Sequence, residues 1–195
     1  MNLLVDRLPD SIEVCGGSYA IHTDYRYWVR FETMMLDGTV EDAVKIATLL
    51  TLCYKEMPPS LPEAFSAMLA FYLGRDMEGQ GNGKKKPDGG RRPPVYSFEH
   101  DADYIYSAFW SQYRIDLQKE QLHWYQFKAL FKSLSDDNQF VKIMEYRAVD
   151  LATVKDKAQK SFYRRMKALY RLPDNRTEAE KEKAMIEGLD SLFSL

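Results

Sequence analysis

The chain has 195 residues, enough for one domain of ordinary size with a conventional hydrophobic core. Its residues are 45% apolar and 29% charged, which is a globular composition, and the formal net charge of −2 excludes a polycation that coats nucleic acid along its whole length. Because it has no long apolar run, no basic leader and only two cysteines, we expect an intracellular protein without a membrane span, a signal peptide or a disulfide framework.

The first predicted element is a β-hairpin within residues 1–24. Short segments of alternating apolar and polar residues flank Gly16 and Gly17, a pair that supplies positive φ at both turn positions. This register pairs Val14 with Tyr19 and Ile12 with Ile21. It also places four apolar side chains on one side of the hairpin: Ile12, Val14, Tyr19 and Ile21. Because a lone hairpin is marginally stable in water, that side should pack on helices as part of the main domain.

Residues 25–74 are predicted to be a helical half with three helices. Thr39 is placed to cap the second helix, which carries apolar residues on several faces and should therefore be central and buried. The third helix should begin with a capping box from Ser60 to Glu63 and end at Gly74.

Residues 75–96 are rich in glycine and lysine and should form a flexible loop. Between Lys84 and Arg92 there are five positive residues and one negative residue, a net charge of +4. A solvated loop explains this charge. The alternative is an arm that contacts phosphates through its lysines, namely Lys84, Lys85 and Lys86.

Helices resume in a second helical half, residues 97–172. Asp101 and Asp103 stand at the first helix start, where carboxylates cap amides and face the positive end of the helix dipole. Residues 173–195 should form a tail with a short amphipathic helix. The fold class predicted from these elements is mainly α, with a small N-terminal β-hairpin packed on a multi-helix bundle.

Residues able to carry chemistry are few. The three histidines have no second His or Cys at zinc-ligand spacing, and no Gly-x-Ser-x-Gly motif is present. His100 and Asp101 are similar to the His-Asp pair of metal-dependent phosphohydrolases, but the further ligands that such sites need are not evident. We therefore expect a protein that is not an enzyme and has no metal or cofactor.

The helix predicted over 155–171 is strongly basic, with seven Lys or Arg against one Asp. Three interpretations stay open. Its apolar stripe packs inward and its lysines face water; or it binds RNA or DNA through Arg164 and Arg165, together with the loop 84–92; or it is a docking face for an acidic helix of another protein. In the first interpretation the inward stripe consists of Ala158, Phe162, Arg165 and Leu169.

Three blocks resemble a family of proteins from long-tailed phages and prophages of Gram-positive bacteria. They are residues 1–26, residues 98–117, and residues 122–147 with their Leu-His-Trp start and Met-x-Tyr-Arg ending. The family is named for the fifteenth gene product of one such phage. This sequence carries Arg114 where the family pattern suggests Gly, so we expect a less sharp turn there or a continuing helix.

The resemblance implies a tail assembly chaperone. Such a protein binds the long helical tape-measure protein in the host cytoplasm, keeps it soluble until tail-tube subunits polymerise around it, and is absent from the finished virion. The alternative partners that the resemblance leaves open are the tail-tube protein and a second copy of the chain. Interface hot spots favour aromatic residues, so our candidate contacts are Trp28, Tyr104, Trp110, Trp124, Tyr125 and Phe131. Three weaker candidates are Tyr106, Tyr113 and Tyr163. Each of these rings could instead pack in the core.

Overall fold

The N-terminal hairpin consists of β1 (Ser11–Val14) and β2 (Gly17–Ala20), which pair antiparallel. A computed structural model describes residues 2–74 and 94–173 of the chain. The two turn residues are Cys15 and Gly16, with φ of 51° and 77°, so the predicted turn at Gly16 and Gly17 is wrong by one residue. Gly17 is instead the first residue of β2, where a Cβ would lie 3.1 Å from the Tyr19 ring.

The faces of the hairpin are nevertheless as predicted. Ile12 pairs with Tyr19 rather than with Ile21. This moves the register by two residues, and side chains alternate with a period of two, so each one keeps its face. Ile12, Val14 and Ile21 are all buried, and β1 packs on a helix as expected.

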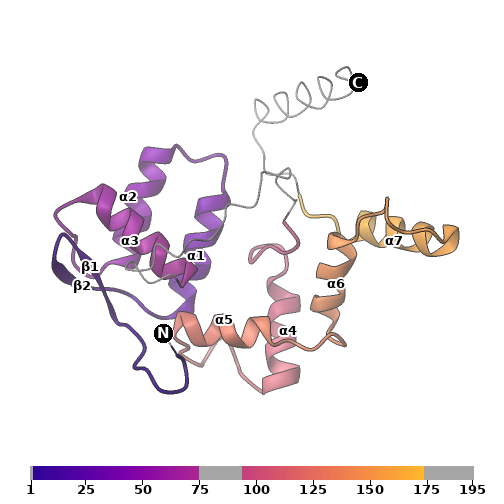
Figure 1. Cartoon of the computed structure of the whole chain (residues 1–195), viewed down its shortest axis with the longest axis horizontal. Helices are drawn as coiled ribbons and strands as arrows, with labels where there is room; N and C mark the ends of the chain where they lie inside the picture. Colours follow the sequence, from indigo (N-terminus) through magenta and orange to yellow (C-terminus); the bar gives the residue numbers. More distant parts are fainter. Residues whose placement is uncertain (1, 75–93, 174–195) are drawn as a thin grey trace.

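Three helices follow the hairpin (Figure 1): α1 (Tyr25–Leu36), α2 (Asp42–Cys53) and α3 (Leu61–Leu73). The α3 helix ends as predicted at Gly74, which has a left-handed φ of 74°. Its predicted capping box is wrong, because the Ser60 side chain makes no capping hydrogen bond. The Glu63 carboxylate instead accepts a hydrogen bond from Cys15 Sγ on the hairpin, at 2.8 Å.

The α2 helix buries one face only, and the prediction of a central helix is wrong. Leu49, Leu50 and Cys53 are buried, whereas Val44 is 54% exposed. Thr39 does not cap this helix either; its hydroxyl donates to Asp37 Oδ1 at 2.6 Å. The side of α2 that turns away from α1 and α3 therefore faces solvent.

Four helices make up the second half: α4 (Ala102–Tyr113), α5 (Trp124–Lys132), α6 (Gln139–Ala148) and α7 (Lys157–Leu169). The chain just before α5 pairs with the chain just before α1, where Trp124 N donates to Thr23 O and Tyr25 N donates to Leu122 O. In this way α5, which packs on α1, joins the first half to α4 through the Phe109–Phe127 contact and to α6 through the Phe131–Phe140 contact (Figure 1). None of these described helices combines the length and hydropathy that a membrane span requires.

Aromatic rings fill a core shared by both halves. Trp28 of α1 has no exposed surface, and Phe127 of α5 stacks on Tyr25 at 4.5 Å and on Phe109 of α4 at 5.1 Å between ring centroids. The described chain is thus mainly α with a small N-terminal β-hairpin, as the sequence predicts.

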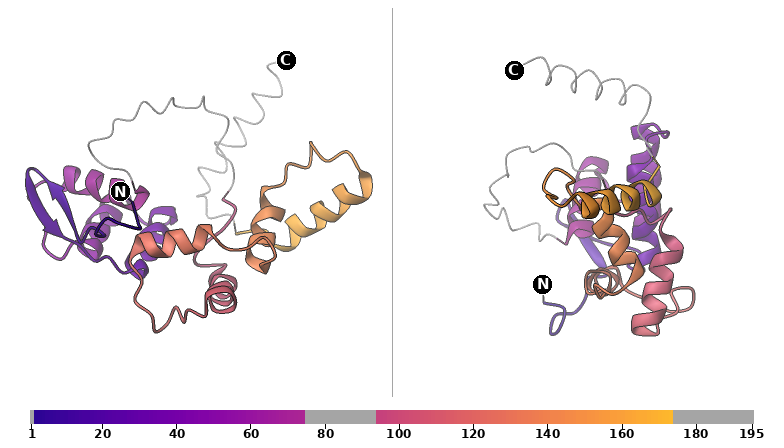
Figure 2. Two further views of the ribbon diagram at one scale, coloured as in Figure 1. Left: turned by 60° about the horizontal axis from the view of Figure 1, so that its bottom comes forward. Right: turned by 90° about the vertical axis from the view of Figure 1, so that its right-hand side faces the viewer.

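The α7 helix lies beside α6, at the end of the molecule away from the hairpin (Figure 2). None of its residues is buried. The predicted inward stripe is wrong, because Phe162 is 40% and Leu169 is 66% exposed. Most of the predicted Gly/Lys-rich loop (75–96) and of the predicted tail (173–195) lies outside the described chain, which leaves out residues 75–93 and 174–195.

Candidate functional site

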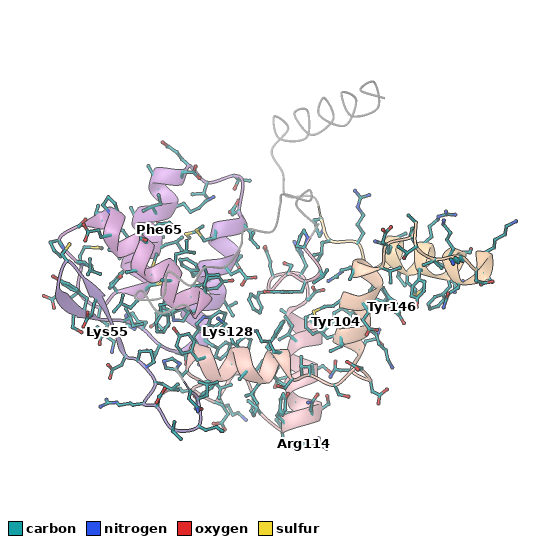
Figure 3. The ribbon with its side chains drawn as sticks, viewed as in Figure 1. Lys55, Phe65, Tyr104, Arg114, Lys128 and Tyr146 are labelled. Atoms are coloured by element: carbon teal, nitrogen blue, oxygen red, sulfur yellow. The ribbon has the colours of Figure 1, made fainter. Side chains whose placement is uncertain are left out.

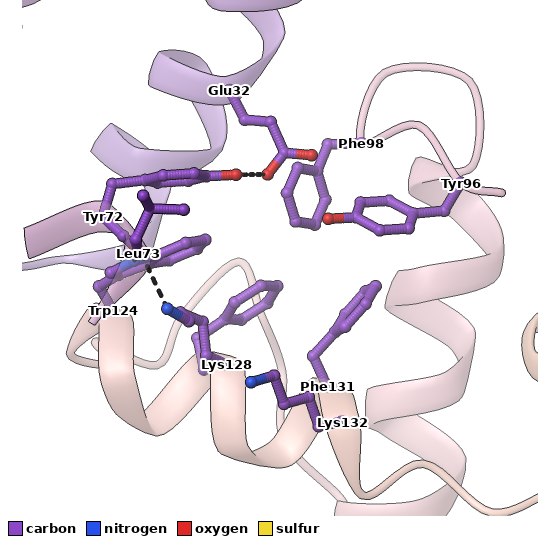
Figure 4. A pocket seen from close by; sticks show the side chains of 10 residues that line it. Glu32, Tyr72, Leu73, Tyr96, Phe98, Trp124, Lys128, Phe131 and Lys132 are labelled. Carbon is purple, nitrogen blue, oxygen red and sulfur yellow. Dashed lines mark hydrogen bonds between the residues drawn. The ribbon is translucent and has the colours of Figure 1, made fainter. Parts of the chain in front are cut away.

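A cleft of about 360 Å³ opens between the two halves of the fold (Figure 4). We call it the aromatic cleft, because rings form most of its walls. Helix α1 contributes Glu32, the end of α3 contributes Tyr72 and Leu73, and the segment before α4 contributes Tyr96 and Phe98. Helix α5 contributes one face with helical spacing: Trp124, Phe127, Lys128, Phe131 and Lys132.

One end of the aromatic cleft holds the carboxylate of Glu32 (Figure 4). It accepts a hydrogen bond from the Tyr72 hydroxyl, and the Tyr96 hydroxyl points toward it from the segment before α4. Burial raises the pKa of Glu32 above its usual range, and the hydroxyls of Tyr72 and Tyr96 oppose the shift only in part. Among the described residues, no Lys or Arg lies within ion-pair distance of this carboxylate.

The other end of the cleft is basic. Lys128 Nζ donates to Tyr72 O at 2.8 Å and lies 5.6 Å from the ring centroid of Trp124. Burial, with the charge of Lys132 nearby, lowers the pKa of Lys128. Lys128 therefore links α5 to the C-terminal end of α3, where a cation is favoured, while Lys132 stays exposed.

Helix α5 supplies half of the residues that line this cleft, and His123 fixes the start of the helix. Its Nδ1 accepts from Tyr125 N at 3.1 Å, and Gln126 Oε1 accepts from His123 N at 3.0 Å. Because Nδ1 is an acceptor, the ring proton is on Nε2, which donates to Pro9 O at 3.0 Å. Burial lowers the pKa of His123, in keeping with a neutral ring.

The six candidate contacts divide by burial. Trp28, Trp124 and Tyr125 are buried in the core. Their polar atoms are used within the fold; Trp28 Nε1, for example, donates to His22 O at 2.8 Å. Phe131 is half-buried and, with the edge of Trp124, lines the aromatic cleft.

The other two candidates, Tyr104 and Trp110, are exposed on α4, Trp110 to 47%. Of the weaker candidates, Tyr106 is exposed and donates to Asp116 Oδ1 at 3.1 Å, whereas Tyr113 is half-buried and donates to Leu130 O at 2.8 Å. Tyr163 is half-buried beside α6. The exposed rings of α4 therefore remain available to a partner.

The structure also shows where the residues of the nucleic-acid and metal-site interpretations lie. Arg164 and Arg165 are exposed on α7, while Lys84, Lys85 and Lys86 lie outside the described chain. Asp101 does not cap α4 as predicted, because its buried carboxylate pairs with Arg147. No group of three metal-binding side chains occurs in residues 2–74 and 94–173.

Sequence reasoning did not single out Glu32, Tyr96 or Lys128. A signal existed for two of them. Glu32 stands on the apolar stripe of α1 that includes Trp28, and Lys128 shares one face of α5 with Phe131. A charged residue on an apolar stripe must find a polar partner or a water-filled cleft.

The described structure is thus a mainly helical protein with an aromatic cleft that is acidic at one end and basic at the other. The family model described as "Bacteriophage Gp15 protein" matches residues 4–172, and the chain belongs to this bacteriophage family. The resemblance found in the three sequence blocks is thereby confirmed. Comparisons with curated proteins and with solved structures gave no match.

Proposed function

We propose that this protein is a tail assembly chaperone that binds the tape-measure protein of its phage. It acts in the host cytoplasm, keeps the tape-measure protein soluble until tail-tube subunits polymerise around it, and is absent from the finished virion. Membership of a bacteriophage family supports a role in phage assembly. The observation that carries the binding role is the aromatic cleft.

The aromatic cleft suits the side chains of a helical partner. Its volume of about 360 Å³ lies in the range of roughly 300–1,000 Å³ that is usual for binding pockets. A helix laid across it would offer apolar anchors three and four residues apart to rings such as Phe98 and Phe131. Glu32 at one end and Lys132 at the other would fix the direction of that helix, because each charge attracts only the opposite charge.

A second contact region for the same partner is the exposed side of α4. Tyr106 and Trp110 stand one turn apart there, and both are exposed. Trp and Tyr are the residue types that most often contribute large binding energies at interfaces. These rings are separate from the cleft, so their contribution can be measured independently.

Co-expression with the tape-measure protein encoded by the same phage tests the proposal. The wild-type chain should raise the soluble fraction of the tape-measure protein and co-purify with it. Leu73→Gln, at the cleft wall, should reduce the co-purified amount about tenfold, which corresponds to a loss of about 1.4 kcal/mol of binding free energy. The matched control is Leu61→Gln at the other end of the same helix, since both leucines are about equally exposed (43% and 49%).

Two outcomes would remove the proposal. One is a tape-measure protein that is equally soluble without this chain and forms no complex with it. The other is an equal loss of complex in Leu61→Gln and Leu73→Gln, which would mean that the cleft is not the binding site.

A further inference from the structure

Helix α7 is attached to the rest of the molecule along one side. Tyr146 of α6 is the centre of this contact (Figure 3), with its ring centroid 5.9 Å from Phe162, 6.4 Å from Tyr163 and 6.0 Å from Tyr170. Two hydrogen bonds reinforce it: Arg147 Nε donates to Tyr170 O at 2.6 Å, and Lys167 Nζ donates to Val149 O at 2.5 Å. The position of α7 is therefore fixed, although none of its residues is buried.

A partly apolar stripe of α7 borders this contact and continues onto the exposed side of the helix. Ala158, Phe162 and Leu169 share a stripe with Arg165 at helical spacing, and all four are exposed. Phe162 is 40% and Leu169 is 66% exposed. Single exposed leucines are common on protein surfaces, but a Phe, a Leu and an Ala on one stripe of a fixed helix form a surface that a second helix can cover.

The same helix is basic throughout. Its thirteen residues include five Lys or Arg and no Asp or Glu. Arg165 is part of the apolar stripe, whereas Lys157 and Arg164 share the next exposed face of the helix. None of the three has an ion-pair partner among the described residues. Their charges are therefore available to an acidic partner.

We propose that the exposed face of α7 binds an acidic amphipathic helix of another protein. The partner's apolar side chains would cover Phe162 and Leu169, and its carboxylates would pair with Arg164 and Arg165. The combination distinguishes this partner from nucleic acid, because phosphates would engage the cations but would leave Leu169 uncovered. Arginine suits such an interface, since its planar fork binds a carboxylate through two hydrogen bonds.

This surface is separate from the aromatic cleft, which has no α7 residue in its walls. The proposal therefore does not depend on the tape-measure assignment. A failure at α7 would leave the co-expression result with Leu73→Gln unchanged, and a failure of the cleft would leave α7 binding unchanged.

The experiment uses the full chain and a labelled synthetic peptide of about 18 residues, with Leu at helical spacing and Glu on both flanks. A matched peptide carries Lys in place of every Glu. By fluorescence anisotropy at low salt, the acidic peptide should bind at least tenfold more tightly than the basic one. Its affinity should fall as salt is added, since exposed charges are screened.

Two variants of α7 separate the charges from the apolar stripe. Arg164→Glu with Arg165→Glu should weaken binding of the acidic peptide at least tenfold, and Leu169→Gln should weaken it severalfold. The control for the charge reversal is Arg30→Glu with Lys55→Glu, an equal charge change at exposed sites in the first half. Circular dichroism establishes whether each variant is folded. If the Arg164→Glu/Arg165→Glu variant does not fold, the loss of peptide binding in Leu169→Gln decides the test.

Four results would overturn the proposal. The peptides could bind equally, or neither could bind. The Arg30/Lys55 control could lose as much affinity as the Arg164/Arg165 variant. A single-stranded RNA of about 20 nucleotides could bind in place of the acidic peptide and be insensitive to Leu169→Gln, which would assign α7 to nucleic acid.

Discussion

Arg147 and Asp101 form a buried, two-fold hydrogen-bonded ion pair. Nη1 donates to Oδ2 at 2.6 Å and Nη2 donates to Oδ1 at 2.8 Å, with side chains only 9% and 1% exposed. Arg147 Nη1 also donates to Val95 O, and Nε donates to Tyr170 O. One guanidinium thus joins the start of α4, the end of α6, the end of α7 and the segment that leads to Tyr96 in the aromatic cleft.

Removal of one partner of this pair should strongly destabilise the fold. Asp101→Asn leaves the Arg147 charge buried without its counter-charge, which typically costs about 3–5 kcal/mol. Urea unfolding at neutral pH measures the change. Asp103→Asn, two residues along and exposed, is the control and should unfold at nearly the wild-type urea midpoint. An Asp101→Asn protein within about 1 kcal/mol of wild type would contradict this role of the pair.

Arg114→Gly should stabilise the protein. Arg114 ends α4 with a φ of 58°, so it adopts the left-handed conformation that the family pattern assigns to Gly; the expected alternatives, a less sharp turn or a longer helix, are both wrong. A non-glycine residue pays about 1–2 kcal/mol for this conformation, and part of that is offset because glycine loses more chain entropy on folding. We expect a net gain of about 0.5–1 kcal/mol in thermal or urea unfolding.

Gly74→Ala is the reciprocal test. Gly74 ends α3 with a φ of 74°, and an added Cβ would lie 3.5 Å from Lys128 Nζ, in ordinary contact. The expected loss of about 1 kcal/mol therefore reports backbone strain rather than a clash. If Arg114→Gly and Gly74→Ala changed the free energy of unfolding in the same direction, the left-handed conformation would not be what decides stability at these helix ends.

Acidification should destabilise the start of α5 through His123. Burial lowers the pKa of His123 in the folded state below its ordinary value of 6.5. Between these two pKa values the unfolded chain binds more protons, so the free energy of unfolding falls as the pH drops below 6.5. His123→Asn keeps a capping acceptor but does not titrate. Between about pH 7.5 and pH 5.5, the variant should lose less stability than the wild type.

His22 is a second histidine whose pKa burial lowers, so the His123→Asn protein should retain part of the pH dependence. Removal of both rings, with His22→Gln, should reduce it further. An unchanged pH dependence in His123→Asn would mean that the protonated ring is tolerated at this helix start.

Glu32→Gln should stabilise the protein at neutral pH. Burial raises the pKa of Glu32 above its ordinary 4.5, so the folded state binds the proton more tightly, and stability is lost as the pH rises from 4.5 through the folded-state value. Gln still accepts from Tyr72 without a buried charge. Urea unfolding at about pH 5 and pH 8 should show a gain for Glu32→Gln that grows with pH. A constant difference would exclude the titration as its cause.

Trp110→Ala and Trp28→Phe should have opposite effects: the first should reduce partner binding, and the second should reduce stability. Trp110 is 47% exposed, so its removal should shift the unfolding midpoint little while reducing co-purification with the tape-measure protein. Trp28→Phe removes the bond to His22 O and leaves a void, and should destabilise by about 1–3 kcal/mol. Loss of complex in Trp28→Phe without loss of stability would instead favour direct contact by Trp28.

Local sequence signals determined much of this fold. The apolar spacing predicted α1 and α3, Gly74 predicted the end of α3, and alternation predicted which side of the hairpin is buried. The three sequence blocks also identified the family. These signals succeed because backbone conformation and amphipathic periodicity depend on residues within a few positions of one another.

Only the tertiary structure decided the roles of individual side chains. Asp101 is typical of a helix cap in sequence, but its partner is 46 residues away. Trp28 and Trp110 both stand on amphipathic helices, yet one is in the core and the other faces solvent. Burial and charge pairing depend on which distant elements meet. Glu32 and Lys128 therefore acquired a shared cleft only when α1 packed against α5.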